Sequence, residues 1–195
     1  MILPIVGYGD PVLRKKCVEI IAEHPNLKDI IANMYETMYN AYGVGLAAPQ
    51  VGLPIRMFMV DTEPFSDSDE FSEEEKLKLS TFKQTFINAR MLLEEGEEWS
   101  FNEGCLSIPD VREDVYRKSD ITIEFYNENF EKKTETYDGL IARVIQHEYD
   151  HIEGILFTDK IPSLKKTLIK KRLQNIMDGK SNPDYRMKFI NKKGR

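Results

Sequence analysis

The feature that most constrains this chain is a His-Glu-x-x-His sequence at residues 147–151. Residues four positions apart lie on the same face of an α-helix, so a helix here would bring His147 and His151 to one metal ion. Glu148, between them, could then reach a water molecule on that metal. Two of the chain's three histidines lie in this stretch. The segment therefore predicts a helix, Gly139–Glu153, that supplies two metal ligands and a carboxylate base.

A catalytic metal site usually has three protein ligands and keeps one position for water. Two familiar downstream ligands are missing here, because Phe157 replaces the third histidine of one protease pattern and no glutamate follows Glu153. The aspartates that stay open as alternatives are Asp159, Asp178 and Asp184. Cys105, upstream, is the favoured third ligand, since a thiolate beside two imidazoles suits Zn²⁺, Fe²⁺, Co²⁺ or Ni²⁺.

The length of 195 residues suits one domain with a substantial core. The sequence contains no apolar run approaching the roughly 18 residues that a membrane helix needs. Its first residues lack the charged and apolar regions of a secretory signal. With only Cys17 and Cys105, a disulfide framework is not expected, which fits a reducing compartment. We therefore expect a cytoplasmic protein that does not cross a membrane, with Cys17 a small buried side chain.

The hydrophobic pattern predicts a mixture of helices and short strands after an irregular segment at residues 1–16. A helix is expected at Leu27–Tyr42, capped by Asn26 and ended by Gly43 in a left-handed conformation. Asp138 is expected to cap the helix that carries the histidines, and Gly154 to end it. A last helix, capped by Ser163, is expected at Leu164–Met177. The predicted strands are 55–60, 84–88 and 121–126, the last of these forming a hairpin with 130–137.

Charge is distributed unevenly along the chain. Residues 61–79 hold eight acidic and two basic side chains, which indicates an exposed, mobile acidic loop. Residues 160–195 hold twelve Lys or Arg and two Asp, a net charge of +10, which leaves −16 on the rest of the chain. The basic region, including a tail at 180–195, suggests an anionic partner such as RNA. The alternative interpretation is a solvated helix followed by a frayed terminus.

Three blocks of this sequence together resemble the signature motifs of the peptide deformylase family. They are Gly-Val-Gly-Leu-Ala-Ala-Pro-Gln at 43–50, Glu-Gly-Cys-Leu-Ser at 103–107 and Gln-His-Glu-Tyr-Asp-His at 146–151. Their order is that of the family, and their spacing fits once 61–79 is treated as an insertion. One departure is Asn88-Ala89, where the family often has Asn-Pro; it touches no proposed catalytic residue.

The resemblance implies a fold, an activity and a substrate. The fold would be α+β, a single domain over 1–195 with antiparallel strands packed around the central helix that bears the histidines, and a C-terminal helix. The activity would be that of a metal-dependent hydrolase that removes the N-formyl group from N-formylmethionine of new polypeptides and releases formate. A ribosome partner, reached through the basic C-terminal region, is a further expectation.

The resemblance also assigns roles to residues. Cys105, His147 and His151 would hold one divalent ion, with Fe²⁺ the native metal. Glu148 would act as the base, and the Gln50 amide and the Leu106 backbone N–H would stabilise the oxyanion. The expected substrate-binding residues are Val44, Gly45, Phe101, Gly104, Arg112, Leu140 and Val144. Arg117 is expected to pair with Asp150 beside the metal site.

Two other kinds of protein compete with this interpretation. A metalloprotease that cuts internal peptide bonds would share the His-Glu-x-x-His helix, but its usual third ligand is absent. A binding protein that kept the fold and lost catalysis would need neither Glu148 nor Gln50, and both are present. Formate release from a formyl-Met peptide with no internal cleavage would indicate the deformylase, whereas internal cleavage without formate would indicate the protease.

Overall fold

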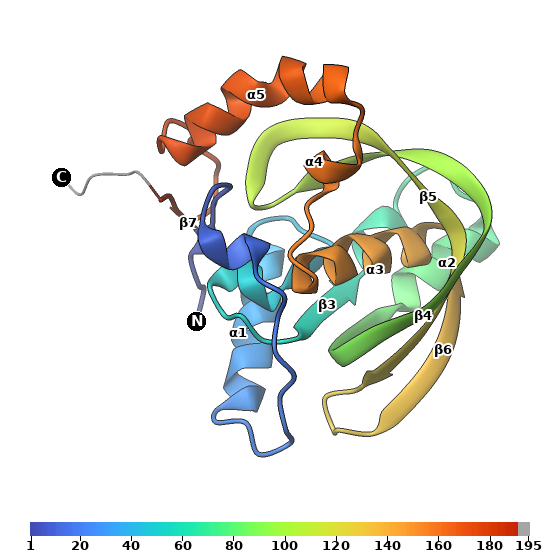
Figure 1. Ribbon diagram of the computed structural model, residues 1–195. Coiled ribbons are helices and arrows are strands. Elements are labelled where there is room, and N and C mark those ends of the chain that lie inside the picture. Colours follow the sequence, from blue (N-terminus) through green and yellow to red (C-terminus); the bar gives the residue numbers. More distant parts are fainter. Residues whose placement is uncertain (191–195) are drawn as a thin grey trace.

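The structure, a computed structural model, describes residues 1–190. Its main sheet has five antiparallel strands in the order β2-β3-β4-β5-β6, and these curve around one central helix, α3 (Figure 1). The elements of this layer are β2 Gly45–Ala47, β3 Met57–Asp61, β4 Lys83–Cys105, β5 Ile108–Tyr126, β6 Lys132–Asp138 and α3 Gly139–Ile152. The α+β class and the central position of the histidine-bearing helix are thus confirmed.

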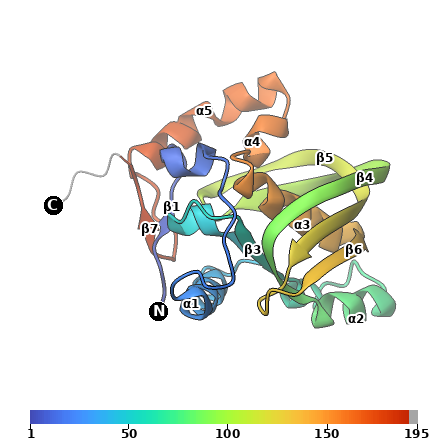
Figure 2. The same ribbon diagram turned by 60° about the horizontal axis from the view of Figure 1, so that its bottom comes forward.

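The remaining elements surround this layer. Figure 2 shows α1 and α2 on one side of the molecule and α5 on the opposite side. The longer ones are α1 Leu27–Asn40, α2 Glu73–Thr81, α4 Phe157–Lys160 and α5 Ser163–Met177. The shorter ones are β1 Ile5–Val6, β7 Met187–Lys188 and the 3-10 turns Pro11–Arg14, Ala48–Val51 and Glu63–Phe65. Among the described residues, no helix is long and apolar enough to cross a membrane.

Helix α3 is buried because its apolar residues fill the concave face of the sheet. Ile141, Ile145 and Ile152 are each at most 2% exposed and join the core cluster that includes the β3, β4 and β5 side chains. The expected cap is absent, since the Asp138 carboxylate pairs with Lys78 and makes no capping hydrogen bond. Gly154 ends the segment in a left-handed conformation, as expected.

Helix α1 forms where a helix was expected and carries an apolar stripe on one face, but its ends differ from the expected ones. Met34 and Met38 are fully buried against β2 and β3 residues of a second core cluster. Asn26 is left-handed and forms no side-chain cap, so the expected cap was wrong. The left-handed residue after the helix is Tyr42, not Gly43. Gly43 is required for space instead, because a Cβ there would lie 2.7 Å from the Leu106 side chain.

Strands β4 and β5 form a hairpin far longer than the sequence indicated. The short strands predicted at 84–88 and 121–126 are only its base. The middle of β4, rich in glutamate at 94–98, is exposed on both faces and therefore lacks the alternation that identifies a strand. The hairpin tip lies between Cys105 and Ile108, and the hairpin curves so that this tip reaches the end of the central helix.

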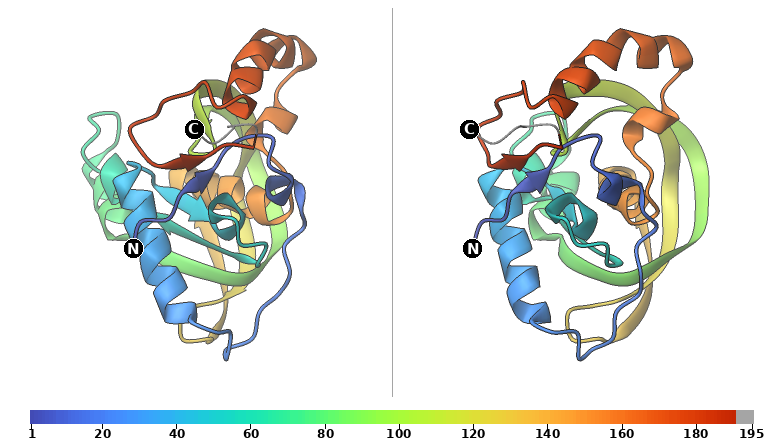
Figure 3. Two further views of the ribbon diagram at one scale, coloured as in Figure 1. Left: turned by 90° about the vertical axis from the view of Figure 1, so that its left-hand side faces the viewer. Right: turned by 60° about the vertical axis from the view of Figure 1, so that its left-hand side comes forward.

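Two segments expected to be irregular contain regular structure. The acidic segment 61–79 is largely exposed, but residues 73–79 of it belong to α2, which begins with a capping box between Ser72 and Glu75. Its status as an insertion stays a prediction. Residues 1–16 contain β1, which pairs in parallel with β7, so the tail before residue 191 is not a frayed terminus (Figure 3). The last part of the predicted tail, 191–195, lies outside the described residues.

Candidate metal centre

Two distant elements meet at the candidate metal centre. Helix α3 presents His147 and His151 one turn apart, and the β4–β5 tip presents Cys105 against them. The Cys105 Sγ lies 3.3 Å from the His151 Nε2, and potential ligand atoms of the three residues all lie within 4.8 Å of one another. One sulfur and two imidazole nitrogens form the ligand set of a catalytic zinc or ferrous site. The residues present therefore fit a single divalent ion.

Glu103 orients one of these ligands. Its Oε2 lies 2.9 Å from the His147 Nδ1, which leaves the Nε2 of that ring for the metal. Arg117 donates to both Glu103 oxygens, at 2.7 and 3.0 Å, and to Asp150 at 2.7 Å, so the expected Arg117–Asp150 pair is present. Burial alone would raise the pKa of Glu103, but hydrogen bonds from His147 and Arg117 hold it well below its usual range. Glu103 is therefore a buried carboxylate anion.

Arg143, which the sequence did not single out, completes this buried network. Its guanidinium lies 3.2 Å from Glu103 and donates to the backbone carbonyls of Val115 at 3.1 Å and Trp99 at 2.6 Å. Two arginines and a histidine thus surround one carboxylate. Removing one partner of such a buried network leaves an uncompensated charge. The sequence could have pointed to Glu103, because it lies two residues before Cys105 in the same block. Nothing in the sequence pointed to Arg143 except its position on the helix that carries the histidines.

Glu148 lies beside the metal ligands without a full set of partners. It is 4% exposed, and its Oε2 has no hydrogen-bond partner. Burial raises the pKa of Glu148 to about 7. Gly45 on β2 makes room for it, because a Cβ at that position would lie 2.4 Å from the Glu148 Oε1. The backbone of β2 therefore approaches the carboxylate as closely as only glycine permits.

Gln50 has its amide fixed in one orientation. The Ala47 backbone N–H donates to its Oε1 at 2.8 Å. The Nε2 therefore points the other way, 3.4 Å from the Cys105 Sγ and 3.3 Å from the Ser107 Oγ. The side chain is 1% exposed. A buried amide donor is thus aimed at the metal centre from the turn that follows β2.

A cavity of about 590 Å³ opens onto these groups, a size suited to a small ligand or a peptide end. Its lining includes the following residues expected from the sequence: Val44, Gly45, Gln50, Phe101, Gly104, Cys105, Leu106, Arg112, Val144, His147 and Glu148. Leu140 is not among them and lines a smaller cavity beside Trp99 and α2 instead. The C-terminal segment from Asn182 to Tyr185 also lines the main cavity, which the sequence did not indicate.

Arg112 is tied to the cavity rim. Its Nε donates to the Asn102 Oδ1 at 2.9 Å, and its Nη2 donates to the Asn102 carbonyl. A Cβ on Gly104 would lie 2.8 Å from the Arg112 Nη1, so the guanidinium lies across the glycine backbone. Phe101 packs edge-on against Trp99, with ring centroids 5.6 Å apart. The rim therefore combines one cation with aromatic surface.

An α+β fold with a Cys-His-His centre, a buried glutamate and an adjoining cavity defines a metal-dependent hydrolase. The family model described as polypeptide deformylase matches residues 2–167. The chain belongs to the peptide deformylase family, and its activity is the removal of the N-formyl group from nascent polypeptides.

Individual relatives agree over nearly the whole length. The peptide deformylase of Flavobacterium psychrophilum is 75% identical over 193 residues, covering 99% of this chain and 100% of the relative. The structure of a peptide deformylase from Legionella pneumophila matches with a TM-score of 0.77 at 29% identity, covering 92% of this chain and 98% of that one. A Plasmodium falciparum peptide deformylase in complex with an inhibitor gives 0.74 at 30% identity, covering 89% and 98%.

Proposed function

We propose that Glu148, Gln50 and the Leu106 backbone N–H carry out deformylation at a metal ion held by Cys105, His147 and His151. The observation that carries this proposal is the convergence of three elements, β2 with its following turn, the β4–β5 tip and α3, on one cavity. Each supplies a different chemical group: an amide, a thiol with a backbone N–H, and two imidazoles with a carboxylate. Such a set suits hydrolysis of an amide by water.

We propose Fe²⁺ as the native ion, on the strength of the family resemblance; Zn²⁺, Ni²⁺ and Co²⁺ suit the same ligand set. A divalent ion held by these three residues would lower the pKa of a bound water molecule towards neutrality and would polarise a carbonyl oxygen. The protein holds the ligands rigid through Glu103, which orients His147, and through Arg117, which links Glu103 to Asp150. These supports are expected to tune metal affinity.

Glu148 is proposed to move the protons. A carboxylate oxygen without a partner, beside the two histidines, is placed to accept a proton from the attacking water. The same group then protonates the departing amine, so that formate and a free methionine amino group are the products. Gly45 leaves the space in which this carboxylate lies beside the histidines.

Gln50 is proposed to donate to the oxyanion together with the Leu106 backbone N–H. Gln50→Ala is expected to lower kcat about 10²- to 10³-fold, because removing one such donor costs roughly this much. KM for a short formyl-Met peptide is expected to change little, since the donor acts mainly in the transition state. Steady-state formate release measures both constants. Gln174→Ala, on the exposed face of α5, is the matched control, and equal kcat in the two variants would refute the role of Gln50.

Substrate binding is proposed to follow the edge of the main sheet. Strand β2 is the terminal strand in the order, so one side of its backbone pairs with β3 and the other does not pair within the sheet. An extended peptide can add to such an edge by main-chain hydrogen bonds. Gly45 and Gly104 would supply these bonds, while Val44 and Val144 contact the methionine side chain and Arg112 lies near the peptide chain. Phe101, which lines the cavity, would lie near its mouth.

The rival assignments give different products. A protease would cut an internal bond of a formyl-Met peptide, and a binding protein would leave it intact. We expect one formate per peptide and no internal fragment, measured by enzymatic formate assay and mass spectrometry. An internal fragment without formate would overturn the proposal.

We further propose a cytoplasmic enzyme that meets its substrate at the ribosome through α5. Leu164 and Leu168 on this helix are 72% and 71% exposed, whereas Ile169 and Ile176 are buried. Exposed cations, Lys170 among them, surround the leucines, and this combination supports contact with an RNA–protein surface.

Neutralising Lys170, Lys171 and Arg172 to Gln is expected to weaken ribosome binding at low salt. The slope of the logarithm of the binding constant against the logarithm of the salt concentration is expected to become shallower by about 2, as for the loss of three phosphate contacts. Sedimentation with ribosomes across a salt series measures this slope. The control triple Lys15, Lys28 and Lys132 to Gln removes the same charge from exposed positions outside α5. Equal slopes in the two triples would rule out α5 as the contact.

A further inference from the structure

The tip of the β4–β5 hairpin is held from outside by both ends of the chain. The Tyr8 backbone N–H donates to the Ser107 carbonyl at 2.8 Å, and the Tyr185 hydroxyl donates to the Leu106 carbonyl at 2.8 Å. These two holding segments are joined to each other, because β1 pairs with β7 (Figure 3). The backbone N–H of Ile5 donates to the Arg186 carbonyl at 2.9 Å, directly beside Tyr185.

Leu106 and Ser107, the two residues held in this way, directly follow Cys105 in the chain. Cys105 provides the sulfur ligand, and Leu106 provides the N–H proposed for the oxyanion. Ser107 accepts the Gln50 amide at 3.3 Å. The Leu106 side chain also packs against the backbone at Gly43, at the other wall of the cavity. A small rotation at Leu106 would therefore displace a ligand, a donor and the partner of a second donor together.

We propose that Tyr185 is a positioning residue for deformylation: its hydroxyl holds the Leu106 carbonyl, and because the peptide planes of that carbonyl and of the Leu106 N–H meet at the Leu106 Cα, it limits the backbone rotation that would turn the N–H. The inference rests on the oxyanion role proposed above for Leu106. Tyr185 lies in the segment 182–185, which also lines the cavity, so this part of the C-terminal region is a wall of the substrate site. The family model ends at residue 167, so the family match does not contain this contribution.

The hydrogen bond from Tyr185 matters through geometry and not through contact with the substrate. A reacting group displaced by about 1 Å can cost about 10²-fold in rate, and losing one neutral hydrogen bond shifts a local equilibrium by about 2- to 12-fold. We therefore expect Tyr185→Phe to lower kcat by about 3- to 10-fold. KM for a short formyl-Met peptide should stay within about twofold, because ground-state binding does not use the oxyanion donor.

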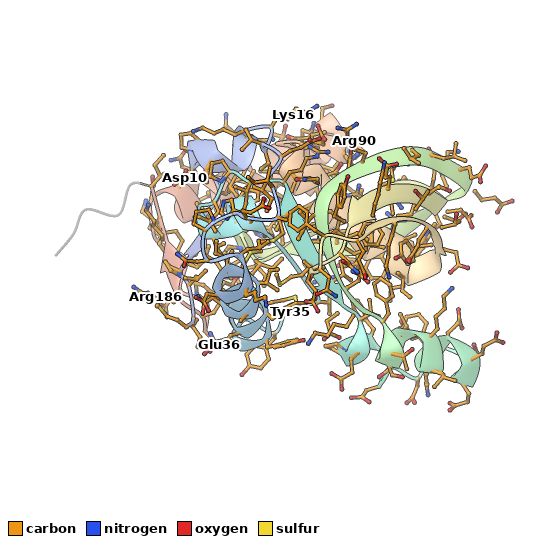
Figure 4. The ribbon with its side chains drawn as sticks, turned by 90° about the horizontal axis from the view of Figure 1, so that it is seen from below. Asp10, Lys16, Tyr35, Glu36, Arg90 and Arg186 are labelled. Carbon is orange, nitrogen blue, oxygen red and sulfur yellow. The ribbon has the colours of Figure 1, made fainter. Side chains whose placement is uncertain are left out.

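Tyr35→Phe is the matched control. Tyr35 lies on α1, as Figure 4 shows, and its hydroxyl is 3.1 Å from the Thr85 Oγ1, so the variant also loses one partly buried hydroxyl hydrogen bond. Tyr35 is not among the residues that line the cavity. If Tyr185 served stability alone, the two variants would have a lowered Tm and an unchanged kcat per metal ion.

The experiment combines kcat, KM and Tm with amide hydrogen exchange of the full-length protein. We expect Tyr185→Phe to lower kcat and to speed exchange specifically in the peptide that contains Leu106 and Ser107, while Tyr35→Phe changes neither. An unchanged kcat in Tyr185→Phe, or unchanged exchange at the tip, would overturn the inference. The exchange measurement does not depend on catalysis, so an inactive wild-type protein would count against the proposed function and not against the positioning of the tip.

Discussion

Glu148→Gln is expected to retain its metal and to lose about two to four orders of magnitude in kcat, the usual contribution of a general acid–base group. Glutamine has the same shape, so it fits the space that Gly45 leaves, but it cannot accept a proton from water. The carboxylate is not among the three ligand residues, so metal content should stay near one ion per chain. Formate release and metal analysis on the same sample measure the two quantities together.

Glu153→Gln is the control for this variant. Glu153 follows the same helix and pairs with Arg56 and Lys16 on the side away from the cavity. Its substitution removes those ion pairs and is expected to lower stability while kcat stays within about twofold. If Glu148→Gln kept more than about one tenth of wild-type kcat, Glu148 would not be the base.

Cys105→Ala is expected to abolish stable metal binding. It removes the thiolate, and alanine offers no replacement donor, so only two imidazoles stay in place. Since substitutions in residues that merely support ligands cost about 10- to 100-fold in metal affinity, loss of a ligand should exceed about 100-fold. In Co²⁺-loaded protein the thiolate-to-metal absorption band should disappear, and activity should fall with metal content.

Cys17→Ala separates loss of a ligand from loss of a thiol. Cys17 is buried in the core, and burial raises the pKa of its thiol to about 11, which fits a small apolar side chain. Its substitution should lower Tm and leave the Co²⁺ band and kcat per metal intact. A Co²⁺ band retained in Cys105→Ala would show that another residue is the third ligand.

Local sequence patterns predicted those helices that bury a single face against the sheet. The stripe of α1 and the apolar face of α3 have helical spacing, because each packs one face on the sheet. The long hairpin escaped prediction because the middle of β4 is polar on both faces, and only pairing with β5 makes it a strand. The β1–β7 pair escaped for a related reason: its partners are about 180 residues apart in the chain.

The sequence predicted the site residues that belong to the three family motifs. It did not predict the residues that support the site only by holding another residue in place. Three blocks resembling one family pointed to Cys105, Gln50 and Glu148, and the structure brings them together. Arg143 and Tyr185 gave no signal, because a buried arginine and a tail tyrosine resemble ordinary helix and surface residues in sequence. Leu140 has the right spacing on α3, but the turn of the helix directs it to the smaller cavity.

The most direct test of this account is an anaerobic titration of metal-free protein with Fe²⁺, with formate release from a formyl-Met tripeptide followed at each step. Exclusion of oxygen protects the ferrous ion and the thiolate of Cys105 from oxidation. We predict that activity rises linearly and saturates at one ion per chain, with one formate and one free amino group formed per peptide. Formate release without added metal would contradict the account. So would a Cys105→Ala variant that binds the activating ion as tightly as the wild-type protein does.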